Sequence, residues 1–202
     1  MSVTFIIPTI NRTTLRRTLE SLLDQTDPNW MAMVVADHVA GFSLPIVDER
    51  IFEFNCPDQK YGNGHFSGVV RNIGMAMISG EWIAFVDDDD TIDPQYVEWL
   101  RSEGTDYDLF IFRMRYHPPR EDNVTILPRP NCGLEGLRDG EVGISFAIRE
   151  RFQMSKNLWF TTEEFEDWIF IRNAMNSGAR TFLSKHIAYF VRHEKADSDS
   201  FT

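Results

Sequence analysis

Apolar residues occur along the chain in short runs and in stripes at helical spacing, with polar residues between them. The runs at 3–7, 31–36 and 83–86 have the length and composition of buried strands. Between the first two runs, four leucines within 15–23 fall on one helical face. A strand, a helix and a second strand in this order predict a parallel sheet with helices on its faces, and therefore an α/β fold.

Similar patterns predict further elements in the rest of the chain. Additional strands are expected at 51–54, 108–114, 142–148 and 188–191, and additional helices at 67–79, from 94 onward and up to about 177. Asn11 and Asp93 are the expected N-caps of the helices that follow them. Thr161 and Glu164 have the spacing of a capping box, which places Glu166 and Asp167 in the second turn of the last helix.

Four consecutive aspartates, Asp87 to Asp90, follow the apolar run 83–86. In α/β sheets, ligands bind beyond the carboxyl ends of the strands. Adjacent carboxylates repel one another, and a folded chain tolerates them best when a cation neutralises them. Mg²⁺ and Mn²⁺ prefer oxygen ligands, and Mg²⁺ sites commonly combine one or two carboxylates with substrate phosphates. The run therefore predicts a metal and phosphate site, and a solvated acidic loop is the ordinary alternative.

Other polar residues are expected at the same edge of the sheet. Thr9, Asn11 and Arg12 follow the first strand, and Asp37 follows the second. Because the carboxyl ends of parallel strands meet at one edge, these side chains should lie beside the aspartate run.

Three further charged features each have an ordinary structural alternative. Arg71 lies in the first turns of helix 67–79, where a surface salt bridge is the common role of an arginine. Glu166 and Asp167 lie near an acidic helix start, which the helix dipole alone favours. His193 follows the last expected strand, and a lone histidine there is more often structural or solvated than a ligand.

Composition narrows the function classes. The 202 residues suit one domain, and 43% hydrophobic residues indicate a globular chain. The formal net charge of −11 argues against a nucleic-acid scaffold and against binding anionic lipid through a basic patch. No apolar run approaches the roughly 20 residues that span a bilayer, and the N-terminus lacks the features of a signal peptide, so a cytoplasmic protein is expected.

In their order along the chain, these motifs resemble those of the inverting family 2 glycosyltransferases, which have the GT-A fold. The resemblance rests on Phe5-Ile6-Ile7-Pro8-Thr9 with Asn11-Arg12, Asp37, Val70-Arg71-Asn72-Ile73-Gly74, Gly80-Glu81-Trp82-Ile83, Asp87-Asp88-Asp89-Asp90 and Glu166-Asp167-Trp168. It implies an α/β, Rossmann-like fold with a mostly parallel central sheet flanked by helices, in a single domain over 1–195. Residues 1–95 would form the nucleotide-binding half and 96–195 the acceptor half, and 196–202 would be a flexible tail or the start of a linker.

The resemblance also implies a reaction and its residues. A UDP-sugar would donate its sugar to a hydroxyl of a glycan or another acceptor, with Mn²⁺ or Mg²⁺ as the cofactor and no nucleic acid as partner. The implied nucleotide-binding residues are Pro8, Thr9, Asn11, Arg12, Asp37, Arg71, Asp87 and Asp88. The implied metal ligands are Asp89 and His193, and the implied catalytic base is Asp167, with Glu166 as the second choice.

Departures and alternatives accompany this resemblance. The segment Ala36-Asp37-His38-Val39 stands where the family usually has Asp-Asp-Gly-Ser, and the acceptor region before Asp167 is compact. A nucleotide-sugar-binding module without turnover is one alternative. Asp87-x-Asp89-x-Thr91 also fits the pattern of haloacid-dehalogenase-type phosphatases, although two strand–helix units precede it here. A longer native chain, such as an algal-virus glycosyltransferase acting in the host-cell cytoplasm, would carry further domains.

Overall fold

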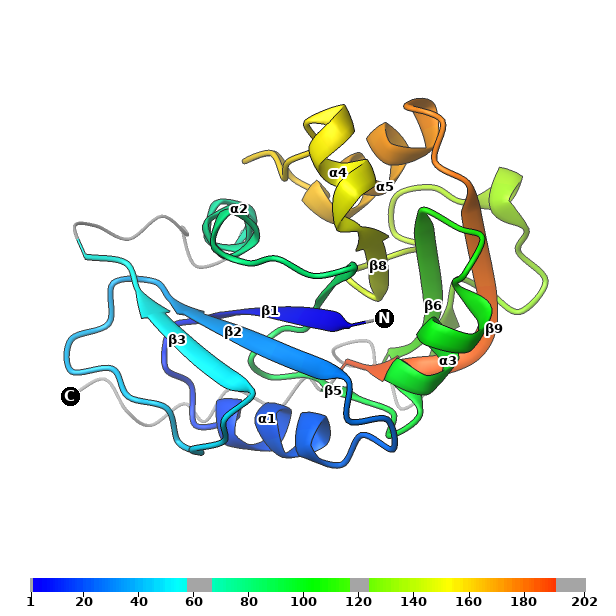
Figure 1. Ribbon diagram of the computed structural model, residues 1–202. Coiled ribbons are helices and arrows are strands. Elements are labelled where there is room, and N and C mark those ends of the chain that lie inside the picture. Colours follow the sequence, from blue (N-terminus) through cyan, green and yellow to red (C-terminus); the bar gives the residue numbers. More distant parts are fainter. Residues whose placement is uncertain (1, 58–66, 117–123, 192–202) are drawn as a thin grey trace.

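A computed structural model describes residues 2–57, 67–116 and 124–191 (Figure 1). The strands are β1 (Val3–Thr9), β2 (Trp30–Ala36), β3 (Ile51–Asn55), β4 (Trp82–Phe85), β5 (Thr91–Ile92), β6 (Leu109–Tyr116), β7 (Thr125–Leu127), β8 (Phe146–Arg149) and β9 (Thr181–Phe190). The helices are α1 (Leu15–Leu23), α2 (Gly68–Met77), α3 (Tyr96–Glu103), the 3-10 turn η1 (Leu134–Gly136), α4 (Glu150–Lys156) and α5 (Glu166–Asn176). The described strands form one sheet in the order β3-β2-β1-β4-β8-β6-β9-β5, with β7 paired to β6.

The sheet consists of a parallel half and a mixed half. β3, β2, β1 and β4 are parallel neighbours. β8 lies antiparallel between β4 and β6, and β6 is parallel to β9. The short strands β5 and β7 add antiparallel ladders to β9 and β6. The α/β fold predicted from the sequence is confirmed.

The strand β1 shows why the first half takes this form. All of its residues are buried, and α1 and α2 lie on opposite faces of β1 and β2 (Figure 1). A strand that is covered on both faces has a continuous apolar sequence in place of an alternating one. The apolar run at the start of the chain therefore predicted a buried strand, and the structure places it between β2 and β4.

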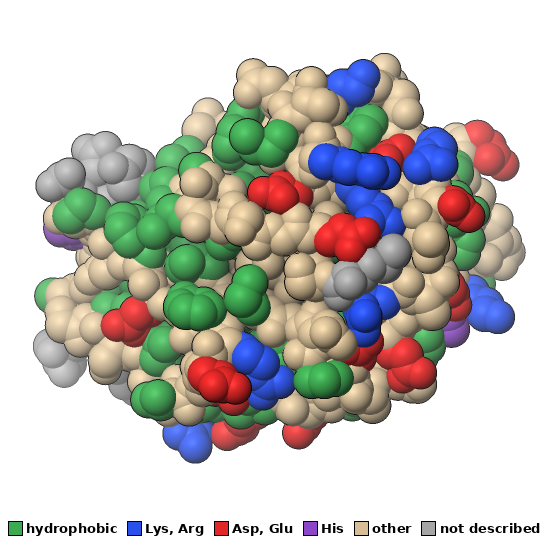
Figure 2. Space-filling view, in the orientation of Figure 1, with side chains coloured by type: hydrophobic (Ala, Val, Ile, Leu, Met, Phe, Trp, Pro, Cys, Tyr) green, Lys and Arg blue, Asp and Glu red, His purple; other side chains and the backbone are tan. Residues whose placement is uncertain are grey.

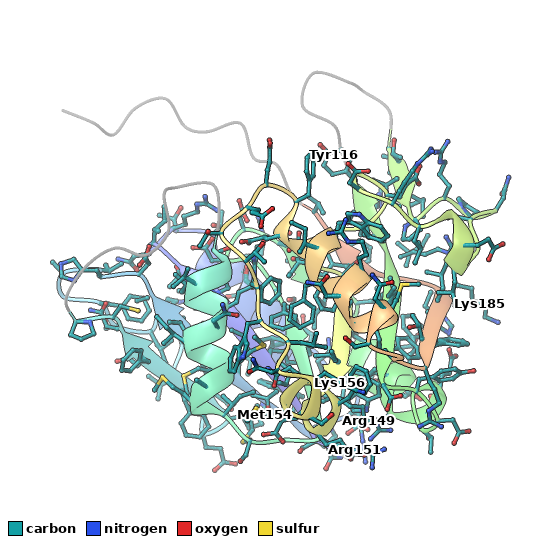
Figure 3. The ribbon with its side chains drawn as sticks, turned by 90° about the horizontal axis from the view of Figure 1, so that it is seen from above. Tyr116, Arg149, Arg151, Met154, Lys156 and Lys185 are labelled. Carbon is teal, nitrogen blue, oxygen red and sulfur yellow. The ribbon has the colours of Figure 1, made fainter. Side chains whose placement is uncertain are left out.

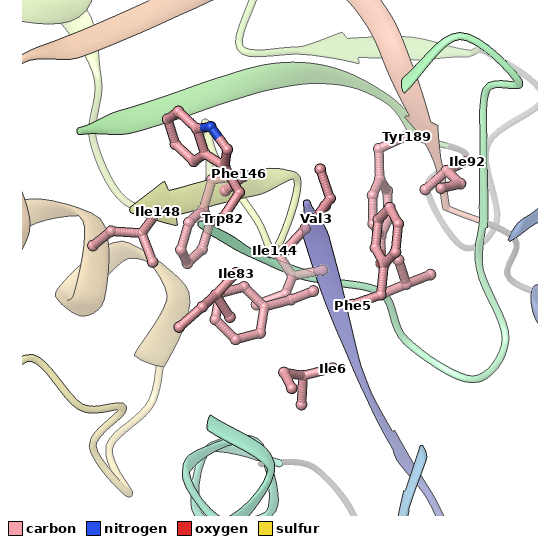
Figure 4. Close-up of a cluster of buried hydrophobic side chains, with 14 of the residues drawn as sticks. Val3, Phe5, Ile6, Trp82, Ile83, Ile92, Ile144, Phe146, Ile148 and Tyr189 are labelled. Carbon is pink, nitrogen blue, oxygen red and sulfur yellow. The ribbon is translucent and has the colours of Figure 1, made fainter. Parts of the chain in front are cut away.

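The hydrophobic core lies around β1, β4 and β8. Phe5, Trp82, Ile83, Phe146 and Ile148 are among its fully buried side chains (Figure 4). They come from three neighbouring strands, so the core ties the parallel half of the sheet to the mixed half.

Four phenylalanines attach α5 to the sheet. The ring centroid of Phe85 in β4 lies 5.2, 5.0 and 6.2 Å from those of Phe146, Phe160 and Phe170. Phe170 belongs to α5, and Phe160 precedes that helix. Their packing holds the first turn of α5 near the carboxyl end of β4.

Two predicted helix caps in the first half are wrong. Asn11 has a left-handed backbone with a φ of 69°, and α1 begins later, with Thr14 as its N-cap. The Asp93 carboxylate accepts a hydrogen bond from the backbone N–H of Gln95 at 2.9 Å, and Gln95 is the N-cap of α3. Asn and Asp favour such turns as readily as caps, so their position alone did not settle the helix start.

The predicted capping box before α5 is also wrong. The Thr161 hydroxyl accepts from the backbone N–H of Glu163 at 3.4 Å, and α5 begins only at Glu166, after Phe165. Phe165 has a φ of 60°, which breaks the helical path. Glu166 and Asp167 therefore lie in the first turn of α5, not the second.

The strand expected at 142–148 is shorter than predicted. Val142 and Ile144 are buried, but the ladder begins only at Phe146. Buried side chains in an irregular segment produce the same apolar pattern as a strand, so the pattern overestimated the strand length. The helix α4, which directly follows β8, was not predicted.

The α-helices of the described residues have seven to eleven residues, and none is long and apolar enough to cross a membrane. On the face shown in Figure 2, hydrophobic side chains gather over β2, β3 and α2. Most Lys and Arg side chains of this face lie near Asp and Glu side chains (Figure 2). Most of the positive charge on this face therefore has negative charge close to it.

Candidate active site

The aspartate run lies at the carboxyl edge of the parallel strands, as predicted. The backbone N–H of Val86 donates to the carbonyl of Ile6 at 3.1 Å, which continues the pairing of β4 with β1 up to the first aspartate. The backbone N–H of Asp37 donates to the carbonyl of Thr9 at 2.9 Å. The ends of β1, β2 and β4 therefore bring the predicted polar residues together at one edge.

Thr9 and Arg12 hold the second and third aspartates of the run. The Thr9 hydroxyl donates to Asp88 Oδ2 at 2.6 Å and accepts from the backbone N–H of Asn11 at 2.9 Å. Arg12 Nη1 lies 3.0 Å from Asp88 Oδ1 and 2.8 Å from Asp89 Oδ2. Burial raises the pKa of Asp88, although Thr9 and Arg12 favour its charged form.

This arrangement changes the interpretation of the run. The sequence suggested that a metal cation neutralises four adjacent carboxylates. In the structure, guanidinium groups supply part of the neutralising charge, because Arg12 contacts Asp88 and Asp89, and Arg71 contacts Asp87. The repulsion alone is thus no argument for a metal.

The helix α1 and the strand β9 supply contacts that sequence reasoning missed. Arg17 Nη2 donates to the carbonyl of Asp89 at 2.9 Å, and the Thr18 hydroxyl donates to the carbonyl of Asp90 at 2.7 Å. The Tyr189 hydroxyl accepts from the backbone N–H of Asp87 at 3.1 Å and hydrogen-bonds the Asp90 side chain. Tyr189 follows Asp87 by 102 positions in the chain, so no local motif could have identified it.

The other predicted nucleotide-binding residues have different exposures. Asn11 is exposed and Arg12 has 43% of its side chain exposed. Pro8 is buried within β1 opposite Val35 of β2, and Asp37 is buried at the end of β2. Asn11 and Arg12 are therefore the residues of this group that are most open to a ligand.

Arg71 joins the aspartate run to α5. Only 3% of the residue is exposed, and it extends from α2 between the two acidic segments. Its Nη2 lies 2.5 Å from Asp87 Oδ1, and its Nη1 hydrogen-bonds Glu166 Oε1 and lies 3.8 Å from Asp167 Oδ1. The surface salt bridge considered as its alternative role is excluded by this burial.

Both carboxylate oxygens of Glu166 are engaged by α2. Oε1 accepts from the backbone N–H of Ser67 at 3.3 Å and from Arg71, and Oε2 accepts from the backbone N–H of Gly68 at 2.9 Å. A Cβ at Gly68 would lie only 2.7 Å from the carbonyl oxygen of Thr161 and 2.9 Å from Phe160 Cβ. Glycine therefore permits the close approach of α2 to the segment before α5.

Asp167 has one buried and one accessible side. Its Oδ1 is buried and has no hydrogen-bond partner, while 29% of the side chain is exposed. Burial raises the pKa of Asp167 to about 7; the positive charge of Arg71 opposes the rise, and the negative charges of Asp87 and Glu166 add to it. A carboxyl group with this pKa can exchange a proton near neutral pH.

The raised pKa of Asp167 makes a prediction about stability. Its folded-state pKa of about 7 lies above the ordinary value of 3.8, so between these pH values the folded chain holds a proton that the unfolded chain has lost. The free energy of unfolding should therefore fall as the pH rises through this window. We expect Asp167→Asn to be more stable than the wild type at about pH 8 and equally stable near pH 4. Thermal unfolding at both pH values measures this; a less stable variant at the higher pH would contradict it.

The predicted metal ligands are only partly within the described residues. Asp89 has 35% of its side chain exposed, whereas His193 lies outside the residues that the structure describes, as does His65. In the described part of the chain, no group of three or more His, Cys, Asp or Glu side chains could hold a metal ion. The accessible carboxylate of Asp89 does fit a Mg²⁺ or Mn²⁺ ion, because these ions bind oxygen ligands and take the others from substrate phosphates and water.

Comparisons with known proteins point to one family. The model of the family described as Glycosyl transferase family 2 matches residues 4–125, which is more than half of the chain. EpsH of Bacillus subtilis (strain 168), which bears a glycosyltransferase name, is 38% identical over 112 residues, or 54% of this chain and 33% of EpsH. The glycosyltransferase GlyA of Streptococcus pneumoniae serotype 4 is 32% identical over 120 residues, which cover 57% of this chain and 17% of GlyA. The chain thus spans a third or less of these curated relatives.

Solved structures share the fold. S. aureus TarS 1–349 in complex with UDP-GlcNAc has a TM-score of 0.76 at 19% identity, covering 100% of this chain and 62% of that one. The mannosyltransferase PcManGT from Pyrobaculum calidifontis, in complex with GDP-Man and Mn²⁺, has a TM-score of 0.67 at 15% identity. The match covers 96% of this chain and 58% of PcManGT. At this identity the similarity establishes a common fold, and the predicted GT-A architecture is confirmed.

Proposed function

The chain belongs to glycosyl transferase family 2, and from this membership we propose that it transfers a sugar from a nucleotide-diphosphate donor to an acceptor hydroxyl. The donor we propose is a UDP-sugar, and the acceptor is a glycan or another hydroxyl compound. The reaction is a single displacement that inverts the configuration at the anomeric carbon. The UDP-GlcNAc bound by the TarS fragment supports a UDP donor.

The observation that carries this proposal is the position of Asp167. Its carboxyl group has a pKa of about 7 and lies beside the aspartate run at the carboxyl edge of the sheet. In the proposed reaction, the acceptor oxygen bonds to the anomeric carbon while the bond from that carbon to the diphosphate oxygen breaks. Asp167 takes the proton of the acceptor hydroxyl, and the bonding electrons leave with UDP. General-base catalysis of this kind contributes about 10²–10⁴-fold in rate.

The donor nucleotide would lie along the ends of β1 and β2. We propose that Asp37 reads the nucleotide base, that Asp87 or Asp88 contacts the ribose, and that Thr9 with Asn11 shapes the loop after β1. The exposed guanidinium of Arg12 is placed to contact the diphosphate, since arginine binds phosphate oxygens through two parallel hydrogen bonds.

We further propose a divalent cation at the carboxyl edge. Asp89 would hold it, with His193 as a second ligand and the donor diphosphate completing the coordination. A bound Mg²⁺ or Mn²⁺ supplies Lewis-acid stabilisation of the negative charge on the departing UDP. The Mn²⁺ present in the PcManGT complex supports this choice of cofactor.

Calorimetry of nucleotide binding tests the proposal. We expect UDP to bind in the presence of Mn²⁺ more tightly than dTDP or GDP, and to lose affinity when a chelator removes the metal. Asp89→Ala should weaken the Mn²⁺-dependent binding by at least the roughly 10–100-fold that loss of an outer-shell partner costs a metal site. Asp106→Asn, an exposed aspartate in the turn before β6, is the matched control and should bind like the wild type.

Other outcomes of this titration, together with assays of transfer and of phosphatase activity, would contradict the proposal. Folded protein that binds none of the three nucleotides would contradict the proposed transferase. Binding without transfer to any acceptor or to water would indicate the module without turnover. Hydrolysis of a chromogenic phosphate monoester would instead indicate the phosphatase.

The boundaries of the domain and the location of the protein in the cell stay predictions. We propose that one domain covers 1–195, with the nucleotide in the half up to 95, the acceptor in the half from 96, and a tail or linker at 196–202. Residues 192–202 lie outside the described part of the chain. Limited proteolysis tests the boundary, and fractionation of the source cells tests the predicted cytoplasmic location.

A further inference from the structure

Arg71 occupies an unusual electrostatic position. One guanidinium lies among three carboxylates that come from two distant parts of the chain: Asp87 after β4, and Glu166 with Asp167 at the start of α5. One positive charge cannot balance three negative charges at close range, so one of the carboxyl groups is favoured in its neutral form. Asp167 is the member whose buried oxygen has no hydrogen-bond partner.

The same contacts leave Arg71 poorly placed to bind a donor phosphate. Its Nη1 and Nη2 are both engaged by carboxylates, and its Nε is buried without a partner. The residue is 3% exposed, whereas Arg12 at the same edge has 43% of its side chain exposed. A diphosphate would reach Arg12 first.

Glu166 is likewise poorly placed to act as a base. Two backbone N–H groups at the start of α2 and the Arg71 guanidinium engage its two oxygens, and it is 6% exposed. A general base must reach the proton that it removes, and these contacts would first have to break. Asp167, the next residue, keeps an accessible side.

We propose that Arg71 and Glu166 are positioning residues that form a buried clamp between α2 and α5 and set the place and protonation of Asp167. Glu166 fixes the first turn of α5 against the start of α2, and Arg71 links that turn to Asp87. The proposal rests on the proposed function for the role of Asp167 as the base. It assigns Arg71 to the positioning of the base and not to the binding of the donor phosphates. It also excludes Glu166 as the catalytic base.

The clamp predicts opposite effects for its two members. The charged groups that face Asp167 are Arg71 from α2, Asp87 from the end of β4 and Glu166 from its own helix. Removing the positive charge of Arg71 should raise the pH at which Asp167 loses its proton. Removing the negative charge of Glu166 should lower that pH. A role limited to packing would not give shifts of opposite sign.

NMR of protein with ¹³C-labelled aspartate carboxyl groups measures this titration directly. The signal of Asp167 is identified by its absence from Asp167→Asn. In Arg71→Met we expect its midpoint to rise by about 1–3 pH units, the usual effect of one arginine on a neighbouring aspartate. In Glu166→Gln, which keeps the side-chain shape, we expect the midpoint to fall. This second variant tests the proposal even if Arg71→Met does not fold.

Arg149→Met is the matched control. Arg149 is also 3% exposed and also pairs with a glutamate, Glu81. It pairs in register with Trp82 at the start of β4, whereas the aspartate run follows the other end of that strand. Figure 3 shows Arg149 and Tyr116, the last residue of β6, at opposite sides of the molecule. Its replacement removes a buried guanidinium that pairs with a partly exposed glutamate, and it should leave the Asp167 midpoint unchanged.

Turnover and donor binding complete the test. In Arg71→Met, kcat near neutral pH should fall by a larger factor than the calorimetric affinity for UDP, because Arg71 reaches the donor site only through Asp87. Glu166→Gln should retain turnover to within about tenfold, whereas loss of a general base costs about 10²–10⁴-fold. An unchanged Asp167 midpoint in Arg71→Met with tenfold weaker UDP binding would overturn the clamp. So would a loss of turnover in Glu166→Gln as large as that of a missing base. A wild type without transfer would refute the proposed function, and the NMR titration would still test the clamp.

Discussion

Replacing Asp167 by Asn is expected to reduce sugar transfer by about 10²–10⁴-fold, the usual contribution of a general base. Asn has nearly the same shape, but its amide cannot take the proton of an acceptor hydroxyl. The carboxyl group of Asp167 has a pKa of about 7, so the wild-type rate should rise as the pH passes through this value and then level off. The variant should lack this rise.

Two measurements separate this effect from a loss of structure. Calorimetry should show that Asp167→Asn binds UDP with Mn²⁺ like the wild type, since the proposed donor contacts lie at the ends of β1 and β2 and in the aspartate run. Asp106→Asn makes the same chemical change at an exposed site and should retain full activity. Unchanged turnover in Asp167→Asn would refute its assignment as the base.

Replacing Phe85 by Ala is expected to lower the free energy of unfolding by about 3–5 kcal/mol. The ring is fully buried, and its centroid lies 5.0 Å from that of Phe160 and 5.2 Å from that of Phe146. Truncation would lose this apolar contact and leave a cavity that the neighbouring rings fill only in part. Because a native domain is stable by only about 5–15 kcal/mol, the loss is large.

Urea unfolding compares this variant with two controls. Phe85→Leu keeps most of the buried volume and should cost clearly less than Phe85→Ala. Phe52→Ala removes an exposed ring from β3 and should change the stability by no more than about 0.5 kcal/mol. Equal losses for Phe85→Ala and Phe52→Ala would contradict the described core. Transfer activity should also fall in proportion to the unfolded fraction, because only the folded chain brings Asp167 to the aspartate run.

The strands and the edge that carries the site could be predicted from the sequence. Strands that are covered on both faces appear as continuous apolar runs, so β1, β2 and β4 were found from their composition. The order of strand and helix then placed Thr9, Asp37 and the aspartate run at one edge, because parallel strands share their carboxyl ends. Helix starts were less reliable, since Asn11, Asp93 and Thr161 form turns with the same residue types that form caps.

The partners of the charged residues could not be predicted in this way. Arg71 and Glu166 are 95 positions apart, and Tyr189 and Asp87 are 102 apart, so only the folding of the sheet and the packing of α5 bring them together. The neutralisation of the aspartates by Arg12 and Arg71 follows from the same packing.

The sequence by itself determined the family, the α/β fold and the edge at which the acidic residues gather, because apolar periodicity and motif order are local properties of the chain. Only the tertiary structure decided that Glu166 is engaged on both oxygens while Asp167 keeps an accessible side. Glu166 and Asp167 are neighbours in the chain, and they differ in this way because the pKa and the accessibility of a side chain depend on the groups that folding packs against it.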